Sequence, residues 1–312
     1  MGMTPGWPIG LSGALLAVGA VEGVVAIEGT PLPLAAEATA VACIDANRAL
    51  LATAAGFETW SLATLEPLAR TPDPLPNLIA LEVAPDAGLA LGVTPQSAVI
   101  YDLADGHSRA ERVPGGTTFV DATLSPEGDS VALGLRNGQL ILWQWRDDIA
   151  QALEADEFAL LAVDGDPQGW VSVGTTGTVK RWSPAGELLG EFTIEVGVGA
   201  VVAAHGERLI HSGGRWPGFC RFTLPLGQSL GCLDSPEAAP YAASLALEGT
   251  MVLGGGAQGN LALSFDGGES WRTALAPQAS PGGVPLVDVE LCGNYGLSVG
   301  EDGAAVRWQV SP

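Results

Sequence analysis

The chain has 312 residues, 47% of them hydrophobic, which is enough apolar material for one large domain. Its formal charge at pH 7 is −22, because 35 acidic residues face 13 basic ones, and Lys180 is its only lysine. Such a surface repels phosphate backbones, so we expect no direct nucleic-acid binding. It forms either a solvated acidic shell or a surface that favours partners with basic side chains.

The first residues are apolar but lack the pattern of a targeting segment. Residues 1–29 contain no Lys or Arg, and the apolar residues 9–27 include Glu22 and several glycines. A signal peptide needs a basic start, and a membrane helix rarely tolerates a mid-span Glu without a partner. We therefore expect strands here, no membrane insertion and a cytoplasmic protein, or a periplasmic or secreted one if a leader was removed.

A unit of about forty residues recurs along the chain. Each copy is an apolar strand, a Gly-containing turn, and a second strand that ends in a large apolar residue followed by a polar one. The eight copies begin at Ala14, Ala49, Leu89, Val131, Val171, Leu209, Val252 and Leu297. After a first interval of 33 residues, their closing pairs (Trp60-Ser61 to Trp308-Gln309) are 39 to 43 residues apart. This regularity indicates a repeat architecture.

Each repeat contains enough strand signals for four strands. Large apolar residues alternate with small or polar ones, and pairs such as Asn137-Gly138 and Asp302-Gly303 supply tight turns. An apolar strand precedes most copies, as in residues 119–124, and a more polar one follows, as in residues 186–194. Four antiparallel strands ordered from inside outward form one blade, so we expect an all-β fold, a closed β-propeller.

The repeat resembles that of WD40-type propellers, and more broadly a divergent bacterial WD40-like or YVTN-like protein. Ser125-Pro126-Glu127-Gly128 matches that family's turn between the first two strands, and Trp143-Gln144 and Tyr101-Asp102 stand where its Trp-Asp pair stands. The chain lacks the family's Gly-His pairs at the starts of its blades. The resemblance therefore implies blades that are held together by apolar packing rather than by a His-Asp network.

One blade also carries a second motif. Ser264, Asp266, Gly268 and Trp271 match the Asp-box pattern, which is found in sialidase-like and photosystem-assembly-factor propellers between the third and fourth strands of a blade. An Asp side chain in such a turn can cap backbone N–H groups while the Trp packs beneath it. The motif indicates fold and predicts a structural role.

The number of blades depends on how the ring closes. Eight copies predict eight blades, but the last copy ends at Val310 with no fourth strand after it. If residues 23–36 supply that strand, residues 39–312 form seven repeat units and residues 1–38 close the ring. We favour this single domain of seven blades, with an extra blade from residues 1–38 as the alternative.

The four cysteines fall into two groups. Cys220 and Cys232 lie on the third and fourth strands of one blade, where they face each other if the turn centres near Leu226; this allows a disulfide only with favourable pairing. Without a leader sequence, free thiols are the expectation. Cys43 and Cys292 lie on matching inner strands, so they are neighbours only in a seven-bladed ring.

The sequence contains little that suggests catalysis. Sialidase chemistry would need an arginine triad beside a tyrosine, and no arginine cluster accompanies Tyr241 or Tyr295. No G-x-S-x-G elbow or Cys/His metal spacing is present, and Asp164-Asp166 and Asp147-Asp148, which could bind calcium, are interpreted as turn or solvated residues. We expect no enzyme activity, no metal and no cofactor.

Two segments are candidates for partner binding. Arg215 and Trp216 stand at a hairpin tip, and Trp and Arg are enriched at binding hot spots. Residues 145–157 replace a simple fourth strand with the pattern of a short amphipathic helix, which would present Trp145, Asp147 and Asp148. We expect a non-catalytic scaffold or accessory subunit that binds proteins, with small-ligand or carbohydrate binding as the alternative and glycoside hydrolysis a distant third.

Overall fold

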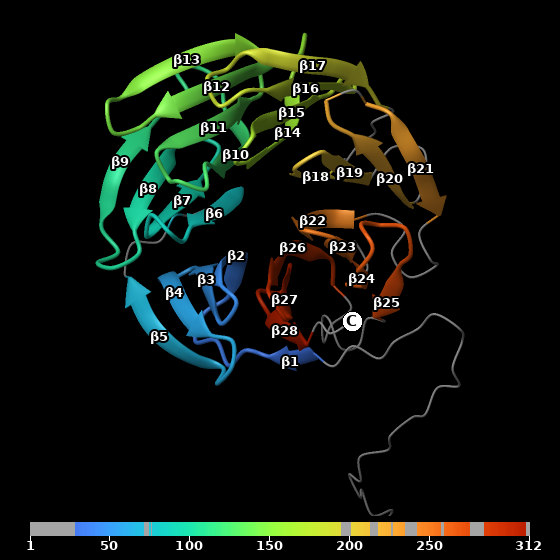
Figure 1. Ribbon diagram of the computed structural model, residues 1–312. Helices are drawn as coiled ribbons and strands as arrows, with labels where there is room; N and C mark the ends of the chain where they lie inside the picture. Colours follow the sequence, from blue (N-terminus) through green and yellow to red (C-terminus); the bar gives the residue numbers. More distant parts are fainter. Residues whose placement is uncertain are drawn as a thin grey trace, which may run out of the picture.

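The computed structural model describes residues 29–71, 75, 77–194, 201–212, 218–225, 227–234, 242–256, 259–274 and 284–309. These residues form 28 strands arranged as seven four-stranded antiparallel sheets around a ring, as Figure 1 shows. The predicted all-β propeller with seven blades is thus confirmed. The described part of the chain contains no helix that could cross a membrane.

The blades share one order of strands, from the centre of the ring outward. The innermost strands are β2 (Ala38–Asp45), β6 (Ala80–Ala84), β10 (Phe119–Leu124), β14 (Leu160–Asp166), β18 (Val201–His205), β22 (Ala242–Glu248) and β26 (Leu286–Cys292). The second strands are β3 (Arg48–Thr53), β7 (Leu89–Val93), β11 (Ser130–Leu135), β15 (Gly169–Gly174), β19 (Arg208–Ser212), β23 (Met251–Gly256) and β27 (Tyr295–Gly300). The third are β4 (Gly56–Ser61), β8 (Ala98–Asp102), β12 (Gln139–Gln144), β16 (Thr178–Trp182), β20 (Gly218–Thr223), β24 (Leu261–Ser264) and β28 (Ala305–Gln309). The outermost are β5 (Glu66–Thr71), β9 (Ser108–Arg112), β13 (Ile149–Glu154), β17 (Leu188–Thr193), β21 (Ser229–Asp234), β25 (Arg272–Ala274) and β1 (Gly29–Pro31).

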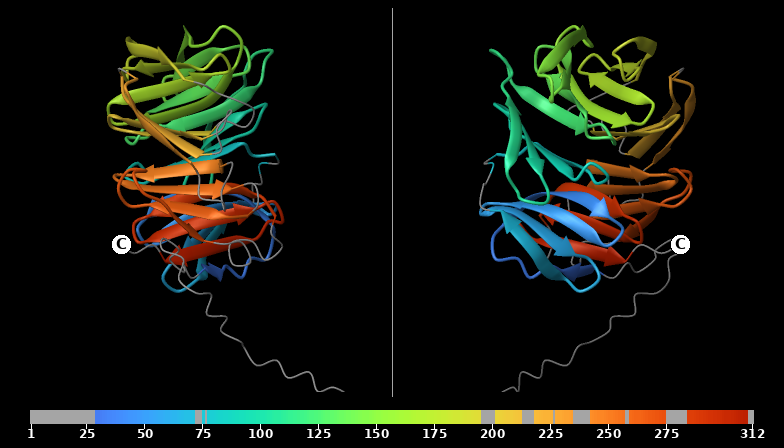
Figure 2. Two further views of the ribbon diagram at one scale, coloured as in Figure 1. Left: turned by 90° about the vertical axis from the view of Figure 1, so that its right-hand side faces the viewer. Right: turned by 60° about the vertical axis from the view of Figure 1, so that its left-hand side comes forward.

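The core lies between neighbouring blades, which the side views in Figure 2 show as separate twisted sheets. Trp60, Trp143 and Trp308, which close the third strands, are at most 1% exposed. In two blades the indole also has a polar partner on the second strand, because Trp182 Nε1 donates to Ser172 Oγ and Trp308 Nε1 to Ser298 Oγ, both at 2.9 Å. The tryptophans of the repeat therefore fill the interfaces between blades, and the buried indole N–H groups of Trp182 and Trp308 each donate a hydrogen bond.

The first strand of the described chain completes the last blade. β1 pairs with β28 in antiparallel register, with Gly29 opposite Trp308 (Figure 1). A Cβ on Gly29 would lie 2.6 Å from the Trp308 ring, so the close approach of the two strands requires glycine. The prediction that the N-terminal segment supplies the missing outer strand is confirmed, while the copy that begins at Ala14 lies outside the described residues.

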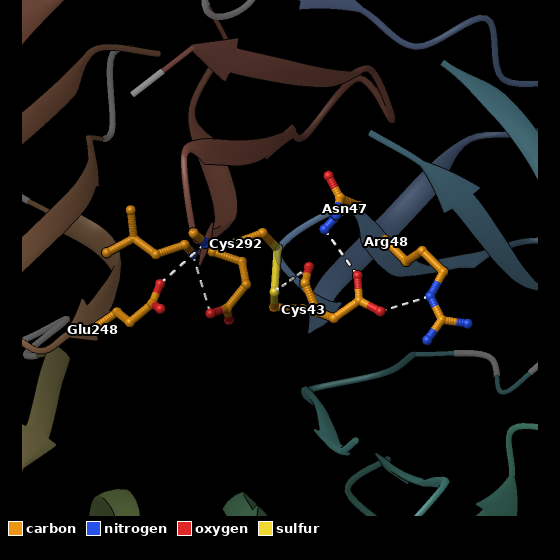
Figure 3. The surroundings of a disulfide bond; sticks show 9 residues. Cys43, Asn47, Arg48, Glu248 and Cys292 are labelled. Atoms are coloured by element: carbon orange, nitrogen blue, oxygen red, sulfur yellow. Dashed lines mark hydrogen bonds and ion pairs between the residues drawn. A yellow bond between two sulfur atoms is a disulfide. The ribbon is translucent and has the colours of Figure 1, made fainter. Parts of the chain in front are cut away.

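A disulfide spans the same seam at the inner strands. Cys43 on β2 and Cys292 on β26 are bonded, with their Cα atoms 5.4 Å apart although the two residues are 249 positions apart in sequence (Figure 3). Cys292 is fully buried, and Glu248 of the preceding blade accepts the N–H of the next residue, Gly293, at 3.2 Å. The two cysteines are neighbours because the ring closes at seven blades. We call this bond the seam disulfide.

The helix predicted for residues 145–157 is wrong. Ile149–Glu154 is instead β13, the outermost strand of its blade, and it pairs along its full length with β12. Alternating residues in this segment fit a strand as well as a helix. The open edge of β12 decides between them, because its unpaired backbone groups gain hydrogen bonds from a strand and none from a helix.

Candidate binding site in the central channel

The seven innermost strands surround a cavity of about 550 Å³ in the centre of the ring. Most of its lining is aliphatic, but five carboxylates from four blades face it: Glu82, Asp121, Asp164, Asp288 and Glu290. Among the described lining residues none is basic and none is aromatic. All charged residues among the described lining residues are therefore acidic, and we call this cavity the acidic channel.

Three of these carboxylates join neighbouring blades. Asp121 accepts the N–H of Val163 in the next blade at 2.8 Å, and Asp164 accepts that of Ala204 at 2.6 Å. Across the seam, Asp288 accepts the N–H of Val41 at 2.9 Å. The innermost strand of each blade has an open edge whose N–H groups point toward the channel, and these side chains satisfy them.

We number the blades 1 to 7 by their innermost strands in chain order, from β2 to β26. Blade 6 (β22–β25) uses a hydroxyl for the same purpose. Ser244 Oγ accepts the N–H of Val289 at 3.2 Å and lies 3.2 Å from Asp288 Oδ1, to which it donates. Asp288 is thereby held from two sides. The polar residues of the inner strands thus both line the channel and connect the blades around it.

The channel carboxylates hold protons more tightly than free carboxyl groups do. Burial, with the nearby charge of Asp288, raises the pKa of Glu290 to about 8, and burial raises that of Asp121 to about 7 despite its hydrogen bonds from backbone N–H groups. Burial likewise raises the pKa of Asp164 and Asp288 to about 6, and burial with the charge of Glu290 raises that of Glu82 well above its ordinary value. The channel therefore titrates near neutral pH and favours any cation that enters it.

Within the described ranges no three acidic, His or Cys side chains are grouped so that they could hold a metal ion. Asp164 is also not in a turn, as the sequence suggested, but inside β14, and Asp166 at the end of that strand makes a buried ion pair with Arg181 at 2.5 Å. The two residues are thus committed to blade contacts.

Of the partner-binding residues predicted from the sequence, the structure describes Trp145, Asp147 and Asp148. Arg215 and Trp216 lie outside the described residues. Trp145 is half-buried and its Nε1 donates to Gly128 O at 2.8 Å, so its indole is used inside its own blade. Asp148 accepts from Trp143 Nε1 at 3.1 Å, while Asp147 is exposed beside it.

The Asp-box residues form a hydrogen-bonded turn between β24 and β25. Asp266 accepts the N–H groups of Glu269 and Ser270 at 2.9 and 2.8 Å and the Ser270 hydroxyl at 2.6 Å, while Ser264 Oγ accepts from Gly268 N at 2.8 Å. Partial burial raises the pKa of Asp266, but these hydrogen bonds outweigh it and lower the pKa to about 2.

The tryptophan of the same motif connects two blades. Trp271 stacks on Phe219 of blade 5, with ring centroids 4.0 Å apart and planes 14° from parallel. The motif thus ties its own turn together and fastens blade 6 to blade 5, which is a structural role.

Cys220 and Cys232 lie directly opposite each other on β20 and β21, and their sulfur atoms are bonded at 2.05 Å. With the seam disulfide, this pairing uses all four cysteines of the chain. The expectation of free thiols is therefore wrong for this structure. The strand register places Cys220 opposite Cys232. A bond between their sulfur atoms also requires the close approach of the two strands.

The acidic channel itself was missed in the sequence. The signal was present as a single acid within an apolar inner strand, as in Ala80–Ala84 and Phe119–Leu124. A lone acid in an apolar strand is an exception to burial rules and indicates a site. Such an acid can be recognised as part of a channel only in the folded ring, where inner strands about forty residues apart in sequence surround one axis.

A scan against protein-family models finds none that matches the chain, and a search of curated proteins finds no significant match. The resemblance to WD40-type and Asp-box propellers thus remains an interpretation of the repeat, and the geometry must carry the functional argument.

Proposed function

We propose that the protein is a non-catalytic binding scaffold, or accessory subunit of a larger complex, that accepts a basic segment of a partner protein at its acidic channel. The observation that carries the proposal is the grouping of five carboxylates around one cavity with no basic residue among the described lining residues. Buried like charges cost free energy unless a positive group joins them. An Arg or Lys side chain from a partner supplies that group.

The chemistry of the lining favours a cationic peptide over the alternative ligands. Carbohydrate sites use aromatic faces and paired acids, and the described lining offers acids such as Asp288 and Glu290 without an aromatic. The chain's net charge of −22 adds long-range attraction for a basic partner. Polar groups on a mostly aliphatic wall suit a side chain with an apolar stem and a charged end.

Protons and a basic segment should compete for the same carboxylates. At about pH 6 Glu290 and Asp121 are largely protonated, because burial raises their pKa to about 8 and about 7. A bound cation favours the ionised forms and so releases protons. We therefore expect affinity for a basic segment to increase between about pH 6 and pH 8.5.

Binding of synthetic peptides tests the proposal. The probes are an extended peptide with alternating Arg and Ala and a matched peptide with Glu in place of Arg, measured by isothermal titration calorimetry at low salt. We expect the wild-type protein to bind only the Arg peptide, and Glu82→Gln/Glu290→Gln to weaken it on the order of tenfold, which is about 1.4 kcal/mol.

A control variant separates the channel from the overall charge. Glu157→Gln/Glu187→Gln changes the formal charge by the same amount at two exposed positions outside the cavity lining. It should bind the Arg peptide about as tightly as the wild type does. Equal weakening by both double variants would show that general surface charge is responsible and would refute binding at the channel.

The cysteine pairing also bears on where the protein works. Disulfides persist in oxidising compartments, and all four cysteines are paired. We infer a periplasmic or extracellular protein rather than the cytoplasmic one expected from the sequence. The basic partner should then belong to the same compartment.

A further inference from the structure

The second disulfide, Cys220–Cys232, lies in the outer half of blade 5 and is open to solvent. Cys232 stands on the outermost strand and is exposed, and Cys220 is half-buried. An incoming thiol can thus approach Cys232, whereas Cys292 of the seam disulfide is fully buried.

A buried histidine lies in line with this disulfide. The strand registers put His211 opposite Cys220, and Cys220 opposite Cys232. Residues directly opposite each other in an antiparallel sheet have side chains on the same face, so the three side chains form a row across β19, β20 and β21.

The imidazole of this histidine has unused hydrogen-bonding capacity. His211 is 2% exposed, and its Nε2 has no hydrogen-bond partner among the described residues. Burial lowers its pKa to about 4, so the ring is neutral at physiological pH. A buried polar atom without a partner is costly and calls for an explanation.

We propose that Cys220–Cys232 is a thiol-exchange site, in which Cys232 receives the sulfur of a low-molecular-weight thiol and His211 stabilises Cys220 as the leaving group. The thiolate attacks Cys232 Sγ and forms a new S–S bond there, and the electron pair of the broken bond stays on Cys220. A second thiol resolves the mixed disulfide. Two thiols are then oxidised to one disulfide, and the protein gains two protons and two electrons.

The geometry gives each residue a distinct part. Exchange occurs at the more accessible sulfur, which is that of Cys232, and proceeds faster when the leaving sulfur is stabilised as a thiolate. An N–H at Nε2 of His211 can donate to that thiolate. The loop between the two cysteines spans only 12 residues, so its opening leaves the ring and its seam closed.

Differential alkylation tests the site in the full-length protein. The folded protein is incubated with increasing reduced glutathione, free thiols are blocked, and the four cysteines are quantified by peptide mass spectrometry. We expect Cys220 and Cys232 to become reactive while Cys43 and Cys292 stay bonded and circular dichroism stays unchanged. Opening of the seam pair first, or of both pairs together only on unfolding, would overturn the proposal.

Two pairs of variants test the roles assigned to these residues. With oxidised glutathione, Cys220→Ser should form a mixed disulfide at Cys232 on the order of tenfold faster than Cys232→Ser forms one at Cys220. His211→Phe should slow reduction of the Cys220–Cys232 bond several-fold relative to His211→Gln, which keeps an N–H donor. Equal rates within either pair of variants would refute the corresponding part.

Discussion

The seam disulfide provides a quantitative test of how the ring is held closed. Replacing both of its cysteines, as Cys43→Ala/Cys292→Ala, leaves only non-covalent contacts across the seam, among them the β1–β28 pairing and the bond from Val41 N to Asp288. The cross-link spans 249 residues, and in the chain-entropy model a loop of that length lowers the entropy of the unfolded chain by an amount worth about 5.5 kcal/mol at 25 °C. Cys220–Cys232 spans 12 residues, for which the same relation gives about 2.8 kcal/mol.

The assay is guanidinium unfolding, followed by tryptophan fluorescence, of the wild type and two double variants, with Cys220→Ala/Cys232→Ala as the matched control. Each variant loses two sulfur atoms and one cross-link, so loop length is the main difference between them. Repeating the measurement in reductant isolates packing, because the wild type then has no cross-links. We expect the seam variant to lose about twice the free energy of unfolding that the control loses under oxidising conditions.

Two results would refute this reasoning. If both variants lost equal free energy, loop length would not govern the effect, and native contacts at the seam would have to explain it. If the seam variant lost no more under oxidising than under reducing conditions, the cross-link itself would contribute nothing. Either result would leave the non-covalent contacts across the seam, among them the β1–β28 pairing, as what closes the ring.

Two further predictions concern pH and the Asp-box turn. Burial raises the pKa of Glu290 to about 8 and that of Glu82 well above its ordinary value, so near neutral pH the folded chain binds more protons than the unfolded chain. The free energy of unfolding should therefore rise on the order of 2 kcal/mol as pH falls from about 8.5 to 6.5. Glu82→Gln/Glu290→Gln should raise stability at about pH 8.5 and flatten this slope, and an unchanged slope in thermal melts would contradict the assignment. Asp266→Ala should cost about 1 kcal/mol at pH 7 by removing the caps of Glu269 and Ser270, whereas Asp302→Ala, which removes one weaker turn bond at 3.1 Å, should cost less.

The blade pattern was predictable because it depends on short-range chemistry. Trp60, Trp143, Trp182 and Trp308 each close a third strand, and the spacing between them is set by the strands and turns of one blade. The closure by β1 followed from one missing strand at the end of the chain. Both inferences needed only the local sequence pattern and the number of strands expected in each blade.

Residues 145–157 show where local patterns lead to a wrong prediction. Ile149 and Leu153 are four residues apart, as on one face of a helix, yet Ile149 is 57% exposed in the outermost strand. Five of the six residues of this strand are exposed and only Leu153 packs against the core, so hydrophobic periodicity carries little information about it. Pairing with β12 determines the conformation, and that pairing is tertiary.

The acidic channel shows the other kind of limit, because its chemistry exists only in the closed ring. Asp121, Asp164 and Asp288 come from three different blades and each caps the next blade's backbone, which explains why an acid or a hydroxyl stands at these positions. Glu82 has no such partner among the described residues, and Glu290 accepts only the N–H of the adjacent Leu291, at 3.1 Å. Capping therefore accounts for the aspartates but not for the two glutamates. Carboxylates that destabilise the empty ring and bind no neighbouring blade are the ones that a basic partner would explain, and for this reason the binding and pH tests both act on Glu82 and Glu290.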